Sequence, residues 1–299
     1  MSEIIGFIGL GNMGGPMAAN LVRAGYRVRG FDLDAASLAT AKEAGIEIAG
    51  SALEAAEAAG TVVTMLPAGH HVIEVWTQLT EAAPSGTLLI DSSTVDVASA
   101  RRAHALAEAR GCPSVDAPVS GGTGGAKAGT LTFMAGGSET AFARAEPILK
   151  GMGRSIFHCG EAGAGQAAKI CNNMILGISM IGVCEAFALG EKLGLSRQAL
   201  FDVASVSSGQ CWSLTTYCPV PGPVPTSPAN NAYRPGFAAS LMLKDLRLAQ
   251  AAAGTAGAAT PLGAEAAQLY AVFEGLGHGG DDFSAIINML RGRHTGDQG

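Results

Sequence analysis

The chain has 299 residues, of which 48% are hydrophobic and 5% aromatic, and a formal net charge of −6. This length predicts one large domain and a second, smaller one. The chain has no block of Lys or Arg, so no nucleic-acid partner is expected, because neutralising phosphates requires a basic patch. Six scattered cysteines without a CxxC pair, and the absence of HxxxH and HExxH, predict reduced thiols and no bound metal.

The first half of the chain alternates short apolar runs with helical patterns. The predicted strands are residues 3–9, 27–32, 61–66, 87–92, 114–119, 131–136 and 155–159, and the predicted helices are 14–24, 35–44, 97–110, 141–149 and one that begins over 72–77. This alternation predicts a mostly parallel sheet with helices on both faces, an α/β Rossmann-type doubly wound sheet.

After Gly160 the strand signal ends and helical patterns follow. The predicted helices are a long one at about 165–193, then 197–206, 240–253, 261–274 and 283–290, with a proline-rich loop at 217–235. The apolar residues of the long helix lie on all of its sides, so we expect the helix to be buried between domains or subunits. Its apolar run Met174–Leu189 contains Glu185 and is too short to favour a membrane span. The N-terminus leads directly into a strand, which argues against a targeting peptide.

The segment Gly9-Leu10-Gly11-Asn12-Met13-Gly14 follows the first predicted strand and opens the first predicted helix. In a dinucleotide-binding turn, Gly9 permits the tight turn, Gly11 lets the backbone approach a pyrophosphate, and Gly14 lets the helix pack on the sheet. The helix N-terminus then supplies N–H groups and partial positive charge. The alternative is a glycine turn that binds nothing.

Asp32 ends the second predicted strand, 23 residues after Gly9. A carboxylate at this position accepts hydrogen bonds from both ribose hydroxyls and repels a 2′-phosphate, which favours NAD over NADP. The neighbouring Arg29 weakens that preference. The alternative interpretation is a solvated aspartate that caps the next helix.

Three more segments lie at the ends of predicted strands, where open α/β sheets bind ligands. Ser120, Gly121 and Gly122, in the run Asp116–Gly122, offer a hydroxyl and accessible N–H groups that suit a carboxylate, or they form a flexible glycine loop. Asp91–Thr94 ends another strand near the expected nicotinamide or ribose. Met65-Leu66-Pro67 ends a third strand and is expected to pack on the cofactor.

Lys169 and Asn173 lie one turn apart on the long predicted helix and share a face. A lysine among small and apolar neighbours has its pKa lowered towards neutrality, which suits it to take a hydroxyl proton as hydride leaves. Asn173 is placed to orient the same hydroxyl. The alternative is a lysine on a solvated face. Lys244, also in apolar company, is expected to close over the cofactor or to pair with a substrate carboxylate.

These segments resemble the β-hydroxyacid dehydrogenase family over nearly the whole chain. The resemblance implies a Rossmann domain at 1–162, a helical domain at 163–299 that forms dimers or tetramers, and a long helix that joins them. It implies that Lys169 is the catalytic acid/base. The family positions that hold substrate match Ser120, Gly121, Gly122 and Asn173, and those that contact NAD match Met65, Leu66, Thr94 and Lys244.

Within this family, the segments 211–213, 219–222 and 230–231, together with Phe237, are similar to the 3-hydroxyisobutyrate dehydrogenase branch. The similarity implies oxidation of 3-hydroxyisobutyrate to methylmalonate semialdehyde in valine breakdown, with Trp212 and Phe237 in the substrate site. Because the transit peptide of animal mitochondrial members is missing, a bacterial cytoplasmic enzyme is expected.

Two alternatives remain open at this stage. One is a reductase of tartronate semialdehyde, glyoxylate or succinic semialdehyde, which shares the first set of motifs. Another is a non-catalytic dinucleotide-binding scaffold, because a fold alone permits loss of the chemistry. Imine-reducing relatives are disfavoured because they tend to replace the lysine at the position of Lys169.

Overall fold

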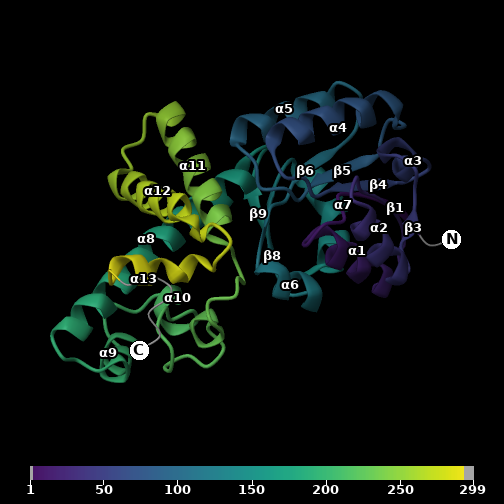
Figure 1. Cartoon of the computed structure of the whole chain (residues 1–299). Coiled ribbons are helices and arrows are strands. Elements are labelled where there is room, and N and C mark those ends of the chain that lie inside the picture. The colour runs from purple at the N-terminus through teal and green to yellow at the C-terminus, as the bar shows by residue number, and fades with distance from the viewer. Residues whose placement is uncertain (1–2, 293–299) are drawn as a thin grey trace. The chain divides into compact units, whose positions relative to one another are not determined.

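The computed structural model describes residues 3–292 of the chain (Figure 1). The chain divides after Lys169 into two compact units, called here the N-terminal unit and the C-terminal unit. Helix α8 (Ala164–Lys192) is continuous across this division. The boundary expected between residues 162 and 163 lies just before that helix.

The N-terminal unit is built on one nine-stranded sheet with the order β3-β2-β1-β4-β5-β6-β8-β7, in which β9 pairs with β8. The pairs are parallel except for β6 with β8 and β7 with β8, which are antiparallel. The strands are β1 (Ile4–Ile8), β2 (Arg27–Phe31), β3 (Glu47–Ile48), β4 (Thr61–Thr64), β5 (Leu88–Asp91), β6 (Ser114–Asp116), β7 (Val119–Ser120), β8 (Leu131–Gly136) and β9 (Gly153–Gly160).

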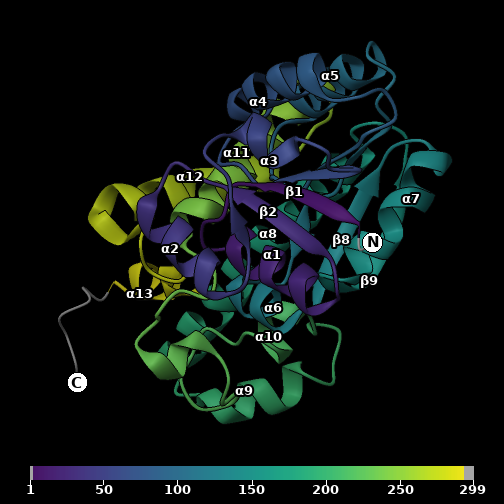
Figure 2. The same ribbon diagram turned by 90° about the vertical axis from the view of Figure 1, so that its right-hand side faces the viewer.

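Helices cover both faces of this sheet, and each face has its own apolar core (Figures 1 and 2). One face carries α1 (Gly14–Arg23), α2 (Ala35–Glu43), α6 (Gly122–Ala128) and α7 (Glu139–Lys150). The other carries α3 (Ala52–Ala56), α4 (Gly69–Ala82) and α5 (Val97–Glu108). The expected doubly wound α/β sheet is confirmed.

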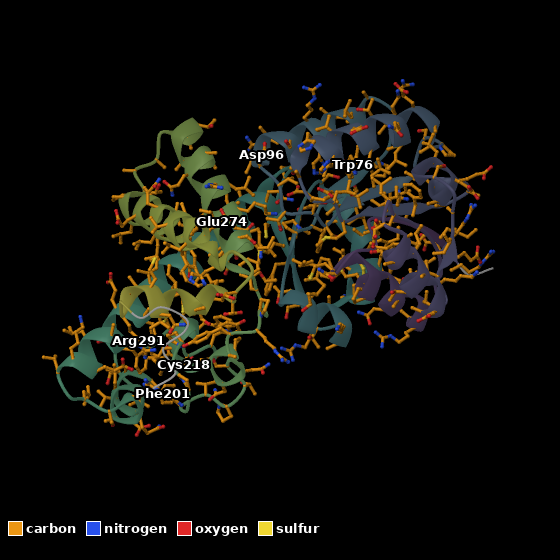
Figure 3. All side chains as sticks on the ribbon, in the orientation of Figure 1. Trp76, Asp96, Phe201, Cys218, Glu274 and Arg291 are labelled. Carbon is orange, nitrogen blue, oxygen red and sulfur yellow. The ribbon has the colours of Figure 1, made fainter. Side chains whose placement is uncertain are left out.

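The C-terminal unit is helical, as expected. Besides most of α8 it contains α9 (Arg197–Ala204), α10 (Trp212–Thr215), η1 (Pro228–Asn231), α11 (Ala239–Ala256), α12 (Pro261–Phe273), η2 (Glu274–His278), η3 (Phe283–Ala285) and α13 (Ile286–Leu290). Its core joins buried residues of α8, α11, α12 and α13. Arg291, at the end of α13, donates a hydrogen bond to Glu191 of α8 and so ties the last helix to the longest one (Figure 3).

Two features of the sheet differ from the sequence prediction. A single strand over 114–119 is wrong, because Pro118, which has no N–H to donate to a ladder, separates β6 from β7. The glycine run after Ser120 is not a loop throughout. It opens α6, since Gly121 and Gly122 both adopt positive φ, and Gly129 ends that helix in the left-handed conformation.

The short elements β3 and α3 are among those that were not predicted. Helix α3 carries a capping signal in the sequence: Ser51 Oγ accepts a hydrogen bond from Glu54 N, and Glu54 reaches back to Gly50 N. This is a variant of the Ser-x-x-Glu capping box. The strand β3 has only two residues and no comparable pattern.

Within residues 3–292, α8 alone has the length and hydropathy of a membrane span, with 44% of its most apolar window buried. The helix also carries Lys169, Asn172 and Asn173. Its partly buried apolar surface therefore fits a core helix better than a lipid-exposed one.

Candidate active site

The turn between β1 and α1 is shaped by its glycines. Gly9 has φ of +92°, and a Cβ on it would lie 2.2 Å from the carbonyl oxygen of Met65. A Cβ on Gly14 would lie 1.9 Å from the carbonyl oxygen of Gly9. At Gly11, by contrast, a Cβ would meet nothing within 4 Å. Two glycines thus serve the fold, whereas Gly11 leaves open space beside the backbone.

The start of α1 has no side-chain cap. Its N-cap residue is Met13, which accepts no hydrogen bond through its side chain, and no acidic residue occupies the first turn. The first N–H groups of a helix lack carbonyl partners within the helix and favour an anion. The open surface at Gly11 together with this uncapped start fits the pyrophosphate of a dinucleotide.

Asp32 is held against the same turn from the end of β2. Its Oδ2 accepts a hydrogen bond from Leu10 N at 2.6 Å, and its Oδ1 accepts one from Asp34 N at 2.8 Å. The helix-capping role considered as the alternative belongs instead to Asp34, whose carboxylate accepts from Ser37 N and Ser37 Oγ. Those hydrogen bonds from Ser37 hold the pKa of Asp34 below its usual value.

Arg29, which weakened the expected preference for NAD, is directed to other partners. Its Nη1 donates to the carbonyl oxygen of Glu57 at 2.9 Å, and its Nη2 lies 3.9 Å from the Glu54 carboxylate. Both partners belong to or follow α3. The guanidinium is therefore already engaged with acidic and carbonyl groups of its own unit.

Lys169 and Ser120 are brought together within the N-terminal unit. Lys169 Nζ donates a hydrogen bond to Ser120 Oγ at 3.1 Å. The lysine is only 6% exposed, so the solvated-face interpretation is wrong. Ser120 ends β7, and the next two residues, Gly121 and Gly122, lead into α6. An amine, a hydroxyl and a glycine turn thus lie at one place in this unit.

Asp116, at the end of β6, fixes the start of α8, which carries Lys169. It is 1% exposed. Its Oδ1 accepts a hydrogen bond from Gly163 N at 2.8 Å, and its Oδ2 accepts one from Gln166 N at 2.9 Å. His104 Nε2 lies 3.0 Å from Oδ1, and its Nδ1 lies 2.7 Å from Ser114 Oγ. A carboxylate here satisfies two amide groups that the helix itself leaves without partners.

A second buried carboxylate, Asp91, ends the neighbouring strand β5. Its Oδ1 accepts hydrogen bonds from Thr64 Oγ1 at 2.7 Å and from Ser93 Oγ at 2.6 Å. Trp76 Nε1 in turn donates to Thr64 Oγ1 (Figure 3). Burial raises the pKa of Asp91 to about 6, and the negative charge of Asp116 adds to that rise. The expected Met65–Pro67 segment joins this network, since Leu66 N donates to Ser93 Oγ at 2.7 Å.

Four of the expected site residues belong to the C-terminal unit. Asn173, one turn beyond Lys169 in α8, is 2% exposed and donates through Nδ2 to Asp245 Oδ2. Lys244 Nζ lies 3.8 Å from Asp245 Oδ1. Asp245, for which the sequence favours a structural and a functional role equally, thus connects two predicted site residues.

Trp212 and Phe237, the other two, belong to one aromatic cluster. Trp212 stacks on Tyr217 with ring centroids 4.9 Å apart, and Tyr217 stacks on Phe283 at 5.3 Å. Phe237 meets Phe283 edge to face at 5.8 Å. Tyr217 also donates to Asp282, and burial raises the pKa of its phenol above the ordinary value, reinforced by that carboxylate.

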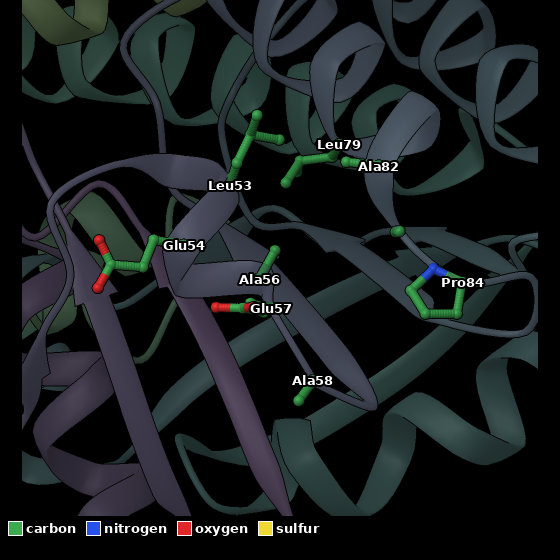
Figure 4. A pocket seen from close by; sticks show the side chains of 9 residues that line it. Leu53, Glu54, Ala56, Glu57, Ala58, Leu79, Ala82 and Pro84 are labelled. Carbon is green, nitrogen blue, oxygen red and sulfur yellow. The ribbon is translucent and has the colours of Figure 1, made fainter.

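A hollow of about 340 Å³ lies along α3 and α4 of the N-terminal unit (Figure 4). It is lined by Leu53, Glu54, Ala56, Glu57, Ala58, Leu79, Ala82, Ala83 and Pro84. None of the expected site residues lines it. The site is therefore defined by side-chain geometry rather than by this hollow.

Comparison with known proteins gives two matching family models. Residues 4–160 match the NAD-binding domain of 6-phosphogluconate dehydrogenase, and residues 163–290 match the NAD-binding model of NADP-dependent 3-hydroxyisobutyrate dehydrogenase.

Individual relatives match over nearly their whole lengths. A solved structure of Mycobacterium tuberculosis 3-hydroxyisobutyrate dehydrogenase with L-serine is 54% identical, covers 97% of this chain and 100% of that chain, and has a TM-score of 0.95. A 3-hydroxyisobutyrate dehydrogenase of Pseudomonas aeruginosa is 50% identical, over 97% of this chain and 99% of its own. An NAD-dependent L-serine dehydrogenase of the same species is 47% identical, over 96% and 97%.

The glycine turn, the fold and these likenesses place the chain among the NAD-dependent oxidoreductases that act on small hydroxy acids. Within this class the chain belongs to the 3-hydroxyisobutyrate dehydrogenase family. The sequence resemblance and the expected NAD cofactor are thereby confirmed.

Proposed function

We propose that the protein oxidises 3-hydroxyisobutyrate reversibly to methylmalonate semialdehyde, with NAD as cofactor, in valine breakdown. The observation that carries this proposal is the buried Lys169, whose Nζ lies 3.1 Å from Ser120 Oγ. The pair supplies a proton acceptor beside a group that binds polar substrate atoms. Its presence argues against the non-catalytic scaffold.

The cofactor is assigned to the turn that its chemistry fits. The Gly9–Gly14 segment, including Leu10, Asn12 and Met13, holds the pyrophosphate at the start of α1. The remaining proposed contacts are Met65, Leu66, Pro67, Thr94 and Lys244. Asp32 selects NAD, since an anion held at the end of β2 repels a 2′-phosphate. When bound, NAD accepts the hydride that leaves the carbinol carbon of the substrate.

The chain's own residues bind the acid and move its proton. Ser120, Gly121 and Gly122 bind the carboxylate through a hydroxyl and N–H groups. Lys169 Nζ takes the proton of the substrate hydroxyl in oxidation and returns it in reduction. Asn173 orients the reacting oxygen, and Asp245 fixes its amide by accepting from Nδ2. One proton and one hydride leave the alcohol, so the product is the aldehyde.

Trp212 and Phe237 are assigned to the substrate side chain. The aromatic cluster offers an apolar surface that suits a methyl group on C2 of the substrate. L-Serine is the second candidate, because one relative is an L-serine dehydrogenase and the M. tuberculosis structure contains L-serine. Serine is also a 3-hydroxy acid with a primary hydroxyl, and it carries an ammonium group where 3-hydroxyisobutyrate carries the methyl.

We also propose a homodimer or homotetramer in a bacterial cytoplasm. Apolar side chains of α8 remain on the surface of the single chain: Ile175 is 66% and Leu189 59% exposed. A second copy of the chain would cover such a surface at low cost. All six cysteines are unpaired, which suits a reducing compartment.

The test is NADH formation by the purified protein with (S)-3-hydroxyisobutyrate, L-serine, glycerate and 4-hydroxybutyrate, each with NAD and with NADP. We expect kcat/KM for 3-hydroxyisobutyrate with NAD to exceed the others by at least about tenfold, which is roughly 1.4 kcal/mol of transition-state binding. A preference for L-serine, glycerate or 4-hydroxybutyrate would reassign the substrate. No turnover of any of them would support the non-catalytic alternative.

A further inference from the structure

Gln166 lies in the first turn of α8 and is fully buried. Its side chain bonds to the segment between β5 and α5. Oε1 accepts a hydrogen bond from Val95 N at 3.1 Å, and Nε2 donates one to the carbonyl oxygen of Ser93 at 2.7 Å. These two backbone groups flank Thr94, a proposed cofactor contact. One amide thus fixes both sides of Thr94 to the helix that carries Lys169.

The main chain of Gln166 is fixed from another strand. Its N–H donates to Asp116 Oδ2 at 2.9 Å, and Gly163 N donates to Asp116 Oδ1 at 2.8 Å. His104 Nε2 contacts the same carboxylate. The turn is therefore connected to β6 through its backbone and to the β5–α5 segment through a side chain. We call Ser93, Val95, Asp116 and Gln166 the α8 brace.

Close packing leaves this turn little freedom to shift. A Cβ on Gly165 would lie 2.2 Å from the carbonyl oxygen of Met134 and 2.8 Å from Asp116 Oδ2. A Cβ on Gly136, in β8, would lie 2.7 Å from Gly165 N. The helix start thus rests directly on the strand ends, so its position is set by backbone contact as well as by hydrogen bonds.

We propose that Gln166 is a positioning residue, which sets the spacing between the Thr94 segment and the amine of Lys169. Lys169 is three residues further along the helix, a rise of about 4.5 Å, and three-residue neighbours share a helix face. A displacement of about 1 Å is enough to cost on the order of 10²-fold in rate. This inference rests on the proposed function, since it needs Thr94 at the cofactor and Lys169 at the proton.

The amide is required at this position because it both donates and accepts. Glutamate keeps the acceptor for Val95 N but sets a carboxylate oxygen against the Ser93 carbonyl. Leucine removes both bonds and leaves a buried N–H and a buried carbonyl without partners, which is costly. Gln166→Glu therefore removes one of the two side-chain hydrogen bonds, and Gln166→Leu removes both. Gln250→Leu is a matched control, because Gln250 in α11 accepts from Thr260 within the C-terminal unit.

The first measurement is hydrogen–deuterium exchange of the cofactor-free protein. We expect faster exchange in peptides covering 92–96 and 163–170 for Gln166→Leu, a smaller increase for Gln166→Glu, and wild-type rates there for Gln250→Leu.

The second measurement is the turnover of substrate deuterated at the carbinol carbon. We expect kcat to fall about tenfold or more and its isotope effect to rise, because hydride transfer becomes slower, while the Kd for NADH changes less than about threefold.

Unchanged exchange at both segments, or faster exchange with wild-type kcat and isotope effect, would overturn the inference. A loss of activity explained by a smaller folded fraction alone, with the isotope effect unchanged, would overturn it as well. Failure of the proposed function gives a different pattern. The wild-type protein would then show no oxidation of any hydroxy acid tested, like the Lys169→Ala protein.

Discussion

The carboxyl edge of the sheet has two halves that are built differently. At the end of β1 and β2, the turn at Gly11 is exposed, α1 has no side-chain cap, and Asp32 is half-buried. At the end of β5 and β6, Asp91 and Asp116 are 2% and 1% exposed. Their carboxylates accept hydrogen bonds from the protein itself.

The difference separates binding from positioning. The β1–β2 half leaves N–H groups and a carboxylate for a ligand to use, as a dinucleotide site requires. The β5–β6 half directs most of its polar atoms to α8 and to the Ser93 turn, although Asp91 Oδ2 and Ser92 Oγ have no hydrogen-bond partner among residues 3–292. A buried polar network of this kind holds its members in one arrangement, because each unpaired group would be costly. Substitutions in the two halves should therefore have different signatures.

The largest expected effect is at Lys169, on helix α8, whose start the β5–β6 half holds through Asp116. Lys169→Ala should lower kcat by about 10²–10⁴, the usual contribution of general acid–base catalysis, with the Kd for NADH nearly unchanged. Steady-state kinetics and NADH fluorescence titration measure the two quantities. Lys150→Ala, at an exposed lysine paired with Glu146, is the control. Near-normal turnover of Lys169→Ala, or a loss of NADH affinity as large as the loss of kcat, would contradict the separation of ligand binding from positioning.

Asp91 tests the same half through stability. Its folded pKa of about 6 lies above the ordinary value of 3.8, so the folded state prefers the protonated carboxyl. The stabilisation from that preference is complete below about pH 3.8 and is lost as the pH rises through about 6. The difference between the two pKa values means that about 3 kcal/mol of this stabilisation has been lost at neutral pH.

Asp91→Asn removes this pH dependence and keeps an Oδ1 acceptor for Thr64 and Ser93. We therefore expect its stability, relative to the wild type, to rise by about 2 kcal/mol between pH 4.5 and pH 7.5, because part of the full effect is already lost at pH 4.5. Urea unfolding at both values measures it, with the exposed Asp202→Asn as control. A constant difference between wild type and variant across this range would show that Asp91 is ionised at both values.

The smallest effect is expected at Asp32, in the β1–β2 half. Asp32→Ala should raise the Kd for NAD about tenfold, roughly 1.4 kcal/mol, and relax the exclusion of NADP, with little change in kcat at saturation. The matched control is Asp34→Ala, which removes the cap of α2 and should cost about 1 kcal/mol of stability without changing the NAD/NADP ratio. An unchanged cofactor preference in Asp32→Ala would remove Asp32 from the specificity site.

The sequence predicts the fold well where periodicity is strong. The strand at 131–136 has the predicted bounds, and the strand and helix alternation gives the correct class. The errors lie where tertiary contacts decide. Pro118 interrupts a predicted strand, and the glycines after Ser120 form a helix because positive φ at Gly121 and Gly122 turns the chain. Only contacts with the rest of the unit fix that conformation.

The site is predictable to the extent that its residues act on ligands. Motif spacing predicts Gly9–Gly14, Asp32, Ser120 and Lys169 as ligand-binding or catalytic residues. It does not predict Gln166, because its side chain bonds to backbone groups distant in sequence: 71 residues separate Gln166 from Val95. It does not predict His104 either, whose partners are the side chains of Ser114 and Asp116. Asp116 was noticed only as the first residue of a glycine-rich segment. No local sequence pattern predicts a residue that holds another helix or strand in place.

The glycine turn also has a consequence for how such chains change over evolution. Gly9 and Gly14 are constrained by their own neighbours, since a Cβ on either would collide with main-chain carbonyls. Gly11 meets no such obstacle within 4 Å. A descendant that abandoned the dinucleotide would be free to drift at position 11 while positions 9 and 14 stayed glycine for the sake of folding. A side chain at 11 between two retained glycines would therefore mark a lineage that kept the architecture and gave up the cofactor.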